Sequence, residues 1–313
     1  MDKCLECSRE FGSEIELHRH LRSHKIKIAD YYFKHFPRFD KFDKTPIDFK
    51  NKEFYFGHDF NNRSNFRRWF LKQANPTLRN YCIDFLLRRK GEKKIIYAPC
   101  QVELRSLQCP SILGFNRIFS DSDYYKVVSG LGFLVQYESP HLAYPEELDY
   151  NPKDGIIWID TREQRPLNFT IPSQLAALPV GDYAFGVESS KSEIVVERKS
   201  VDDFINSFGA DFERIHKEFI RGTSIGKYII VVIECDLKYV LTFNFLPNTS
   251  YKMKVTPEFV FHNVRVCCQE FPNVQFLFVK NRTEASRIIQ KVLVSKDNLV
   301  KFDLQLMHDM DLL

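Results

Sequence analysis

The chain has 313 residues, enough for two or more domains that each bury an apolar core. Its 45 Lys and Arg residues against 41 Asp and Glu residues give a formal net charge of only +4, so the overall charge does not point to a nucleic-acid partner. Phe is abundant (29) and Gly is scarce (12), which argues against long disordered or low-complexity segments.

The sequence shows neither an export signal nor a membrane span. The charged residues at positions 1–4 have no apolar run behind them, and no stretch approaches the ~20 apolar residues that a spanning helix needs. Eight cysteines are present, and apart from one CxxC pair they show no disulfide-like spacing. We therefore expect an intracellular protein (nucleus, nucleoid or cytoplasm) with metal-bound or free thiols and no membrane partner.

Residues 1–25 have the spacing Cys-x2-Cys-x12-His-x3-His, which is typical of a Cys2His2 zinc finger. Phe11 and Leu17 occupy the two apolar positions that form the small core of such a finger. The two histidines are one helical turn apart, so both can reach one tetrahedral ion. The sequence thus predicts a ββα module that binds Zn²⁺ through Cys4, Cys7, His20 and His24.

The sequence predicts the finger but leaves its role open. By resemblance to DNA-reading fingers, Arg19 occupies a base-facing position of the helix, and basic residues follow it. A single finger contacts only ~3 base pairs, which is too few to specify a unique binding site in DNA. The finger therefore contacts nucleic acid, contacts a protein, or stabilises the N-terminal region.

Residues 26–150 form a basic and aromatic region, for which we expect an α+β structure with helices over 64–73, 77–89 and 122–130. Between residues 63 and 94, ten Lys and Arg residues face only two acidic ones, a local charge of +8. Such a concentration favours contact with a phosphate backbone, and the alternative is a solvated face over an aromatic core. The candidate nucleic-acid contacts are Arg67, Arg68, Arg88 and Arg89.

In residues 151–297, strand and helix patterns alternate, which predicts an α/β domain with a mixed central sheet flanked by helices. The expected strands cover 156–159, 193–199, 228–234 and 274–279, with a further strand starting at 182. The expected helices cover 200–207, 211–221, 257–270 and 283–294, the last capped by Thr283. Residues 298–313 are expected to form a tail.

Acidic residues stand at or near the ends of these strands: Asp160, Asp182 and Glu197, with Glu163 just beyond the first. Carboxylates at one edge of a sheet repel one another unless a divalent cation neutralises them, and Mg²⁺ is commonly held by one or two carboxylates. Glu197 and Lys199 share one face of their strand, where the lysine can stabilise an attacking hydroxide or a pentavalent phosphate. The alternative for this pair is an exposed ion pair of little consequence.

These residues resemble a known family. GDY (181–183) followed by ERKSVDD (197–203) is similar to the GDx(n)ERKx3D signature of the XPF-type nucleases, which cut flaps, forks and bubbles in DNA. DTRE (160–163), YIIVVIE (228–234) and FPNVQFLFVKNRTEAS (271–286) also match the family pattern, so the resemblance covers about 155–295. It implies a restriction-endonuclease-like fold of the PD-(D/E)xK superfamily and catalysis with Mg²⁺ or Mn²⁺.

The resemblance also implies a role for each residue of the motif. The expected magnesium ligands are Asp182, Glu197 and Asp160, and Glu163 is a further ligand or water-positioning acid. Lys199 is the expected catalytic lysine, Arg198 supports the site, and Asp203 is its last acid. Two alternatives remain: Asp203 completes a capping box with Ser200, and Arg198, on the opposite face of the strand, pairs with a neighbouring carboxylate.

The sequence therefore predicts a metal-dependent endonuclease that hydrolyses phosphodiester bonds in branched DNA during repair or recombination. Because relatives pair through this domain, a homodimer or a partner subunit is a further expectation. Two alternatives are a nucleic-acid-binding scaffold that has the nuclease fold without the activity, and a sequence-specific restriction or homing-type endonuclease guided by the finger.

Overall fold

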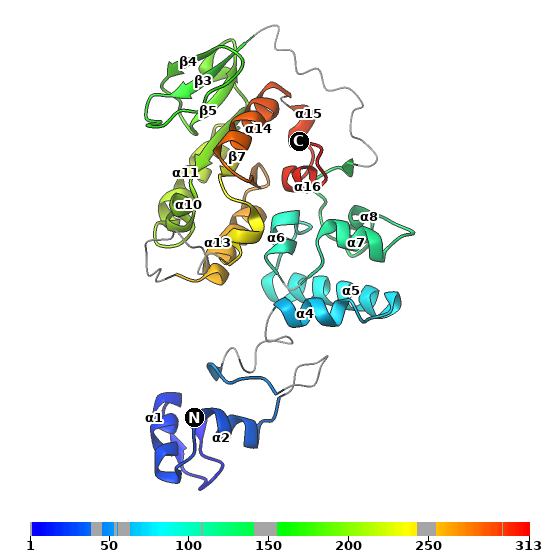
Figure 1. Ribbon diagram of the computed structural model, residues 1–313, viewed down its shortest axis with the longest axis vertical. Helices are drawn as coiled ribbons and strands as arrows, with labels where there is room; N and C mark the ends of the chain where they lie inside the picture. Colours follow the sequence, from blue (N-terminus) through cyan, green and yellow to red (C-terminus); the bar gives the residue numbers. More distant parts are fainter. Residues whose placement is uncertain are drawn as a thin grey trace. The chain divides into compact units, whose positions relative to one another are not determined.

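The computed structural model describes residues 2–38, 46–52, 55, 63–107, 109–140, 155–242, 255–295 and 297–313. The chain divides into two compact units, Met1–Leu78 and Arg79–Leu313 (Figure 1). Helix α5 (Asn75–Lys93) runs across the boundary between them. None of the described helices is long and apolar enough to cross a membrane.

The first unit begins with a ββα arrangement. Its described elements are β1 (Asp2–Lys3), β2 (Glu10–Phe11), α1 (Glu14–Leu21), the 3-10 turn η1 (Arg22–His24), α2 (Ile28–His35) and α4 (Arg63–Phe70). The two short strands are antiparallel, and Ser13 caps α1 by accepting a hydrogen bond from the backbone N–H of Glu16.

The ββα module shares its core with residues that follow it. Tyr31 and Tyr32 of α2 are almost fully buried against Leu17 and Leu21 of α1. The Tyr31 hydroxyl accepts a hydrogen bond from the backbone N–H of Leu5 at 2.9 Å, which fastens α2 to the loop between the strands. Residues of α2 therefore share the apolar core of the module, and the boundary at residue 25 stays a prediction.

The second unit begins with helices. These are α5, α6 (Gln101–Arg105), α7 (Ile112–Ile118) and α8 (Tyr124–Gly130). The α+β structure expected for residues 26–150 is therefore wrong for the described part, where all named elements are helices and Tyr97 forms an isolated bridge with Leu134. Helix α8 starts later than expected because the Asp123 carboxylate, not Ser122, caps it by accepting from the N–H of Lys126 at 2.8 Å.

The rest of the second unit is built on a mixed six-stranded sheet of order β4-β3-β5-β6-β7-β8, which confirms the predicted mixed sheet. Its strands are β3 (Ile156–Asp160), β4 (Ser173–Ala176), β5 (Tyr183–Gly186), β6 (Ile194–Lys199), β7 (Tyr228–Ile233) and β8 (Val274–Phe278). Strand β5 is antiparallel to β3 and β6, whereas β6, β7 and β8 are parallel to one another.

Helices cover both faces of this sheet. On the first face lie α10 (Val201–Phe208), α11 (Phe212–Ser224) and α13 (Pro257–Glu270), and on the second α14 (Arg282–Ser295), α15 (Asp297–Val300) and α16 (Leu304–Asp309). Phe204 and Phe208 are fully buried in the first core, and Ile288 and Leu304 in the second. Strands β3, β5, β6, β7 and β8 therefore send alternate side chains into different cores.

Two sequence expectations about the last helices are wrong. Helix α14 starts at Arg282, and its cap is Asn281, whose side-chain oxygen accepts from the N–H of Glu284 at 3.0 Å, rather than Thr283. The residues expected to form a tail instead pack on the sheet: Gln305 is 1% exposed and its side-chain oxygen accepts from the N–H of Phe278 at 2.8 Å. A polar side chain thus satisfies a backbone donor of the edge strand β8.

Helix α16 also contacts helix α6. The Asp303 carboxylate, which caps α16, also accepts from the backbone N–H of Gln101 at 2.6 Å. Arg105 forms an ion pair with Asp309 at 2.8 Å. The helical beginning of the second unit and its last helix are therefore held together by buried, charge-assisted hydrogen bonds.

We expect Gln305→Leu to lower the free energy of unfolding by ~1–3 kcal/mol, because the buried N–H of Phe278 then lacks an acceptor. Urea unfolding followed by circular dichroism measures the change. Met307→Leu is the matched control, because Met307 lies buried in the same helix and the exchange keeps its volume. Equal stability of Gln305→Leu and the parent would contradict this role for Gln305.

Candidate active site and zinc site

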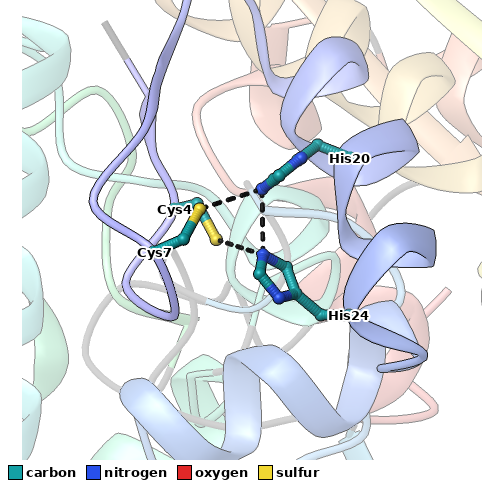
Figure 2. A group of neighbouring side chains, drawn as sticks. All are labelled: Cys4, Cys7, His20 and His24. Atoms are coloured by element: carbon teal, nitrogen blue, oxygen red, sulfur yellow. Dashed lines mark hydrogen bonds between the residues drawn. The ribbon is translucent and has the colours of Figure 1, made fainter.

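The structure brings together the four residues that the finger spacing predicts as metal ligands (Figure 2). Their ligand atoms all lie within 4.8 Å of one another. Cys4 Sγ is 3.7 Å from His24 Nε2, and Cys7 Sγ is 3.1 Å from His20 Nε2. Such distances suit four ligands placed ~2.0–2.3 Å from one central ion.

The donor set is compatible with zinc. Two thiols and two imidazoles form the soft and borderline set that Zn²⁺ prefers in structural sites. Partial burial and the neighbouring His24 lower the pKa of His20, which favours the neutral imidazole that a metal requires. Cys4 is fully buried in the core of the first unit, whereas Cys7 is exposed and the two histidines are half-buried.

We expect Cys7→Ser to lose the bound zinc and to make α1 and α2 accessible to protease, because much of the folding free energy of such modules comes from the metal. Atomic emission of the purified protein and limited proteolysis measure these effects. Cys235→Ser is the control, since Cys235 lies outside the cluster. Full zinc content in Cys7→Ser would contradict the assignment of this ligand.

Successive side chains in the C-terminal half of β6 point to opposite faces of the sheet, which divides the predicted catalytic residues between the two faces. Glu197 and Lys199 project to the same face as Val195, which packs against α10, α11 and α13. Asp182, next to β5, follows the same alternation and lies on this face. Arg198 projects to the second face, where α14 packs.

On the first face, Asp182 and Glu197 are brought together with Lys199. The Lys199 side chain is 7% exposed, and its ammonium group donates to the Glu197 carboxylate at 3.0 Å. The Asp182 carboxylate accepts from the backbone N–H of Arg198 at 2.7 Å. Burial and the neighbouring Glu197 carboxylate raise the pKa of Asp182 to about 8, because two negative charges are costly to keep so close.

A cavity of about 190 Å³ opens beside this pair, and we call it the carboxylate cavity. Its charged lining residues are Arg162, Asp182, Glu197, Glu218 and Arg221. The volume is far more than the ~10–15 Å³ that one water molecule requires. A divalent cation with its waters therefore has room, and it would relieve the repulsion that raises the pKa of Asp182.

Asp160 lies on the same face but has partners of its own. One oxygen accepts from the Nε of Arg162 at 2.6 Å, and the other accepts from the backbone N–H of Leu178 at 2.7 Å. Although burial opposes its ionisation, these hydrogen bonds hold the pKa of Asp160 below its ordinary value. Asp160 thus positions Arg162 at the cavity, and its role as a magnesium ligand stays a prediction.

Arg198 lies at the centre of an ion-pair cluster on the second face. Its guanidinium donates to the Glu163 carboxylate at 3.1 Å and to the Glu234 carboxylate at 2.9 Å. Burial lowers the pKa of Arg198, but the two acids outweigh this effect and raise it. Glu163 therefore pairs with Arg198 on this face, although its charge also contributes to the raised pKa of Asp182. Its role as metal ligand or water-positioning acid stays a prediction.

The sequence did not single out Glu234 and Arg282 as members of this cluster. Arg282, at the start of α14, approaches Glu234 at 3.4 Å and donates to the backbone oxygen of Pro166 at 2.9 Å. Glu234 follows a buried apolar strand in the same way as the predicted acids, which was the available signal. Nothing in the spacing indicates Arg282, which is brought to the cluster by the packing of α14.

Asp203 lies in the first turn of α10 and is exposed. Its backbone N–H donates to the Ser200 hydroxyl at 3.2 Å, and its carboxylate accepts from the same hydroxyl at 2.7 Å. The Ser200 hydroxyl thus caps α10, and the Asp203 carboxylate binds that hydroxyl rather than the backbone N–H of Ser200, so the S-x-x-D spacing gives one half of a capping box.

The predicted nucleic-acid contacts differ in their surroundings. Arg19 lines a groove on the finger with further basic residues, and Arg67 is exposed on α4. Arg88 is exposed over the ring of Phe85, whereas Arg89 is partly buried and burial lowers its pKa. The side chain of Arg68 lies outside the described residues.

Comparison with known families gives a match to one part of the chain. Residues 159–292 match the ERCC4 domain. The matched segment runs from β3 into α14 and contains both faces of the site described above. The match supports the XPF-type resemblance of this part, which makes up less than half of the chain. No curated protein sequence matches the chain.

Two solved structures are similar to this chain. XPF from Aeropyrum pernix in complex with DNA is 19% identical with a TM-score of 0.32, and the alignment covers 43% of this chain and 61% of that one. XPF from Aeropyrum pernix alone is 16% identical with a TM-score of 0.32, and the alignment covers 50% and 68%.

Proposed function

We propose that the chain is a metal-dependent DNA endonuclease that hydrolyses phosphodiester bonds in branched DNA. The observation that carries this proposal is the carboxylate cavity, where Asp182 and Glu197 face a space next to the buried Lys199. The ERCC4 domain match over the same residues supports it. A role in DNA repair or recombination follows from the XPF-type resemblance.

The residues at and beside the cavity would have different roles in the reaction. Asp182 and Glu197 would hold Mg²⁺ or Mn²⁺, which supplies Lewis-acid stabilisation of the charge that develops on the phosphate. Lys199, held in place by Glu197, orients the attacking water and stabilises negative charge as the phosphate becomes pentavalent. Arg162, fixed by Asp160, places a second cation at the cavity.

The Arg198 cluster supports this arrangement from behind the sheet. The backbone N–H of Arg198 donates to Asp182, and its side chain is fixed by two acids on the other face. Strand β6 is thus held at both faces near the point where Glu197 lines the cavity. Such preorganisation lowers the cost of reaching the transition state.

The test compares labelled flap, fork and bubble DNA with linear duplexes of equal length, with Mg²⁺, Mn²⁺ or neither. We expect cleavage only with a divalent cation and only near the branch. Binding without cleavage under any of these conditions would instead indicate a scaffold with a nuclease fold. Cleavage of linear duplexes at one preferred sequence would indicate a restriction or homing-type enzyme guided by the finger.

A further inference from the structure

Helix α11 borders two neighbouring hollows of the second unit. The carboxylate cavity is one, and the other is a cavity of about 570 Å³ along the first three turns of the helix, which we call the α11 groove. Glu218 and Arg221 line both, so the two hollows meet at these side chains. A ligand that occupies the α11 groove therefore reaches Asp182 and Glu197 past Arg221.

Two exposed cations of α11 have no partner among the described residues. The side chains of Lys217 and Arg221 form no hydrogen bond or ion pair there, whereas Arg214 is bound to Glu218 at 2.7 Å. Lys217 and Arg221 are four residues apart, so they share a face of the helix about 6 Å apart along its axis. This spacing is comparable with one step along the backbone of a nucleic-acid strand.

The acids of the groove are placed apart from these cations. Asp211 and Glu213 stand at the start of α11, where the helix dipole favours negative charge. Glu218 is neutralised by Arg214. The unpaired positive charge therefore increases from the beginning of the helix towards the carboxylate cavity, which is the direction in which an anionic strand would be drawn.

We propose that Lys217 and Arg221 hold successive phosphates of the DNA strand that is cut, so that α11 guides this strand into the carboxylate cavity. The inference rests on the proposed nuclease function and names the path of its substrate. Arg221, which lines both hollows, contacts the phosphate nearer the cavity, and Lys217 contacts its neighbour one helical turn away. Both residues position the strand and take no part in the chemical step.

The test measures how salt weakens DNA binding. Fluorescence anisotropy with a labelled flap DNA gives the dissociation constant of the Asp182→Asn protein over a range of salt concentrations. Adding Lys217→Gln and Arg221→Gln is expected to lower the slope of log K against log salt by about 2, as two phosphate contacts are lost. The combination Lys217→Arg with Arg221→Lys should retain the slope.

A matched control removes the same charge elsewhere in the second unit. Arg117 and Lys126 are exposed, and their side chains form no ion pair with described residues. The double variant Arg117→Gln with Lys126→Gln should therefore leave the slope within about 0.5 of the parent value. An equal fall in both double variants, or an unchanged slope in the α11 variant, would overturn the inference. Thermal unfolding confirms that each protein is folded.

The cleavage assay separates this inference from the proposed function. In the active protein, the α11 double variant should raise KM for flap DNA about tenfold or more, with kcat at saturating DNA within about threefold of the parent. If the parent protein cuts no DNA but the binding slope still falls, the nuclease proposal fails and the α11 contact stands. If the parent cuts and neither KM nor the slope changes, the α11 contact fails alone.

Discussion

Asp182→Asn is expected to lower the rate of DNA nicking by roughly 10²–10³-fold or more while the affinity for flap DNA stays within about twofold. The substitution keeps the shape of the side chain and its contact with the backbone N–H of Arg198, but removes the negative charge that faces the carboxylate cavity. Glu197→Gln should act in the same way. Single-turnover cleavage and anisotropy binding measure the two effects separately.

The control for this pair is Asp202→Asn, an exposed acid in the first turn of α10 that does not line the cavity. It should cut at the parent rate. Parent rates in both Asp182→Asn and Glu197→Gln with Mg²⁺ present would show that the cavity is not the active site. Loss of DNA binding in either variant would show that the acids act in folding rather than in catalysis.

The raised pKa of Asp182 gives this site a pH dependence. At pH values below about 8 the metal-free protein holds a proton on Asp182, and a cation must displace it. The Mg²⁺ concentration for half-maximal cleavage should therefore fall as pH rises towards 8. The free energy of unfolding changes in the opposite direction from the affinity for the cation. A carboxyl whose pKa is raised in the folded state lowers the stability of the protein as pH rises from the unfolded-state pKa towards 8. Asp182→Asn should therefore be more stable than the parent at pH 8.

Arg198→Met is expected to lower the free energy of unfolding by ~3–5 kcal/mol at pH 8, because it leaves the half-buried Glu163 carboxylate without a cation and leaves Glu234 with Arg282 alone. Urea unfolding of the whole protein measures the change. Arg214→Met is the matched control: it breaks an exposed pair with Glu218, which contributes little to stability.

A variant with parent stability but no cleavage would give Arg198 a catalytic role in place of the structural one. Equal losses in Arg198→Met and Arg214→Met would contradict the distinction between a buried and an exposed pair.

The fold could be predicted where apolar runs and caps coincide. Helix α13 was predicted over 257–270, and the structure gives the same bounds, with Thr256 as its cap and Pro257 in its first turn. Strand β4 escaped prediction because it is a short, exposed edge with no apolar run. Helix α16 escaped it because Asp303 and Gln305 are polar, and the burial of polar residues depends on partners elsewhere in the chain.

The site could be predicted in part for a similar reason. The period of two in β6 places Glu197 and Lys199 on one face and Arg198 on the other, and the structure agrees. The alternation of side chains along a strand does not indicate which acid forms an ion pair with an arginine. The ion pair of Asp160 with Arg162 was therefore not predicted. Lys217 and Arg221 had a readable signal, two cations four residues apart on a predicted helix.

The contact between α6 and α16 has a consequence for the order of folding. The hydrogen bond from Gln101 to Asp303 joins residues 202 positions apart in the chain, and the ion pair of Arg105 with Asp309 spans 204. Contacts of such separation are slow to form, because the entropy of closing a long loop is lost before the contact compensates for it. On a ribosome, α6 can contact α13 through Glu103 and Gln269 before its contacts with α16 form, because those contacts require residues 303 and 309 to have emerged.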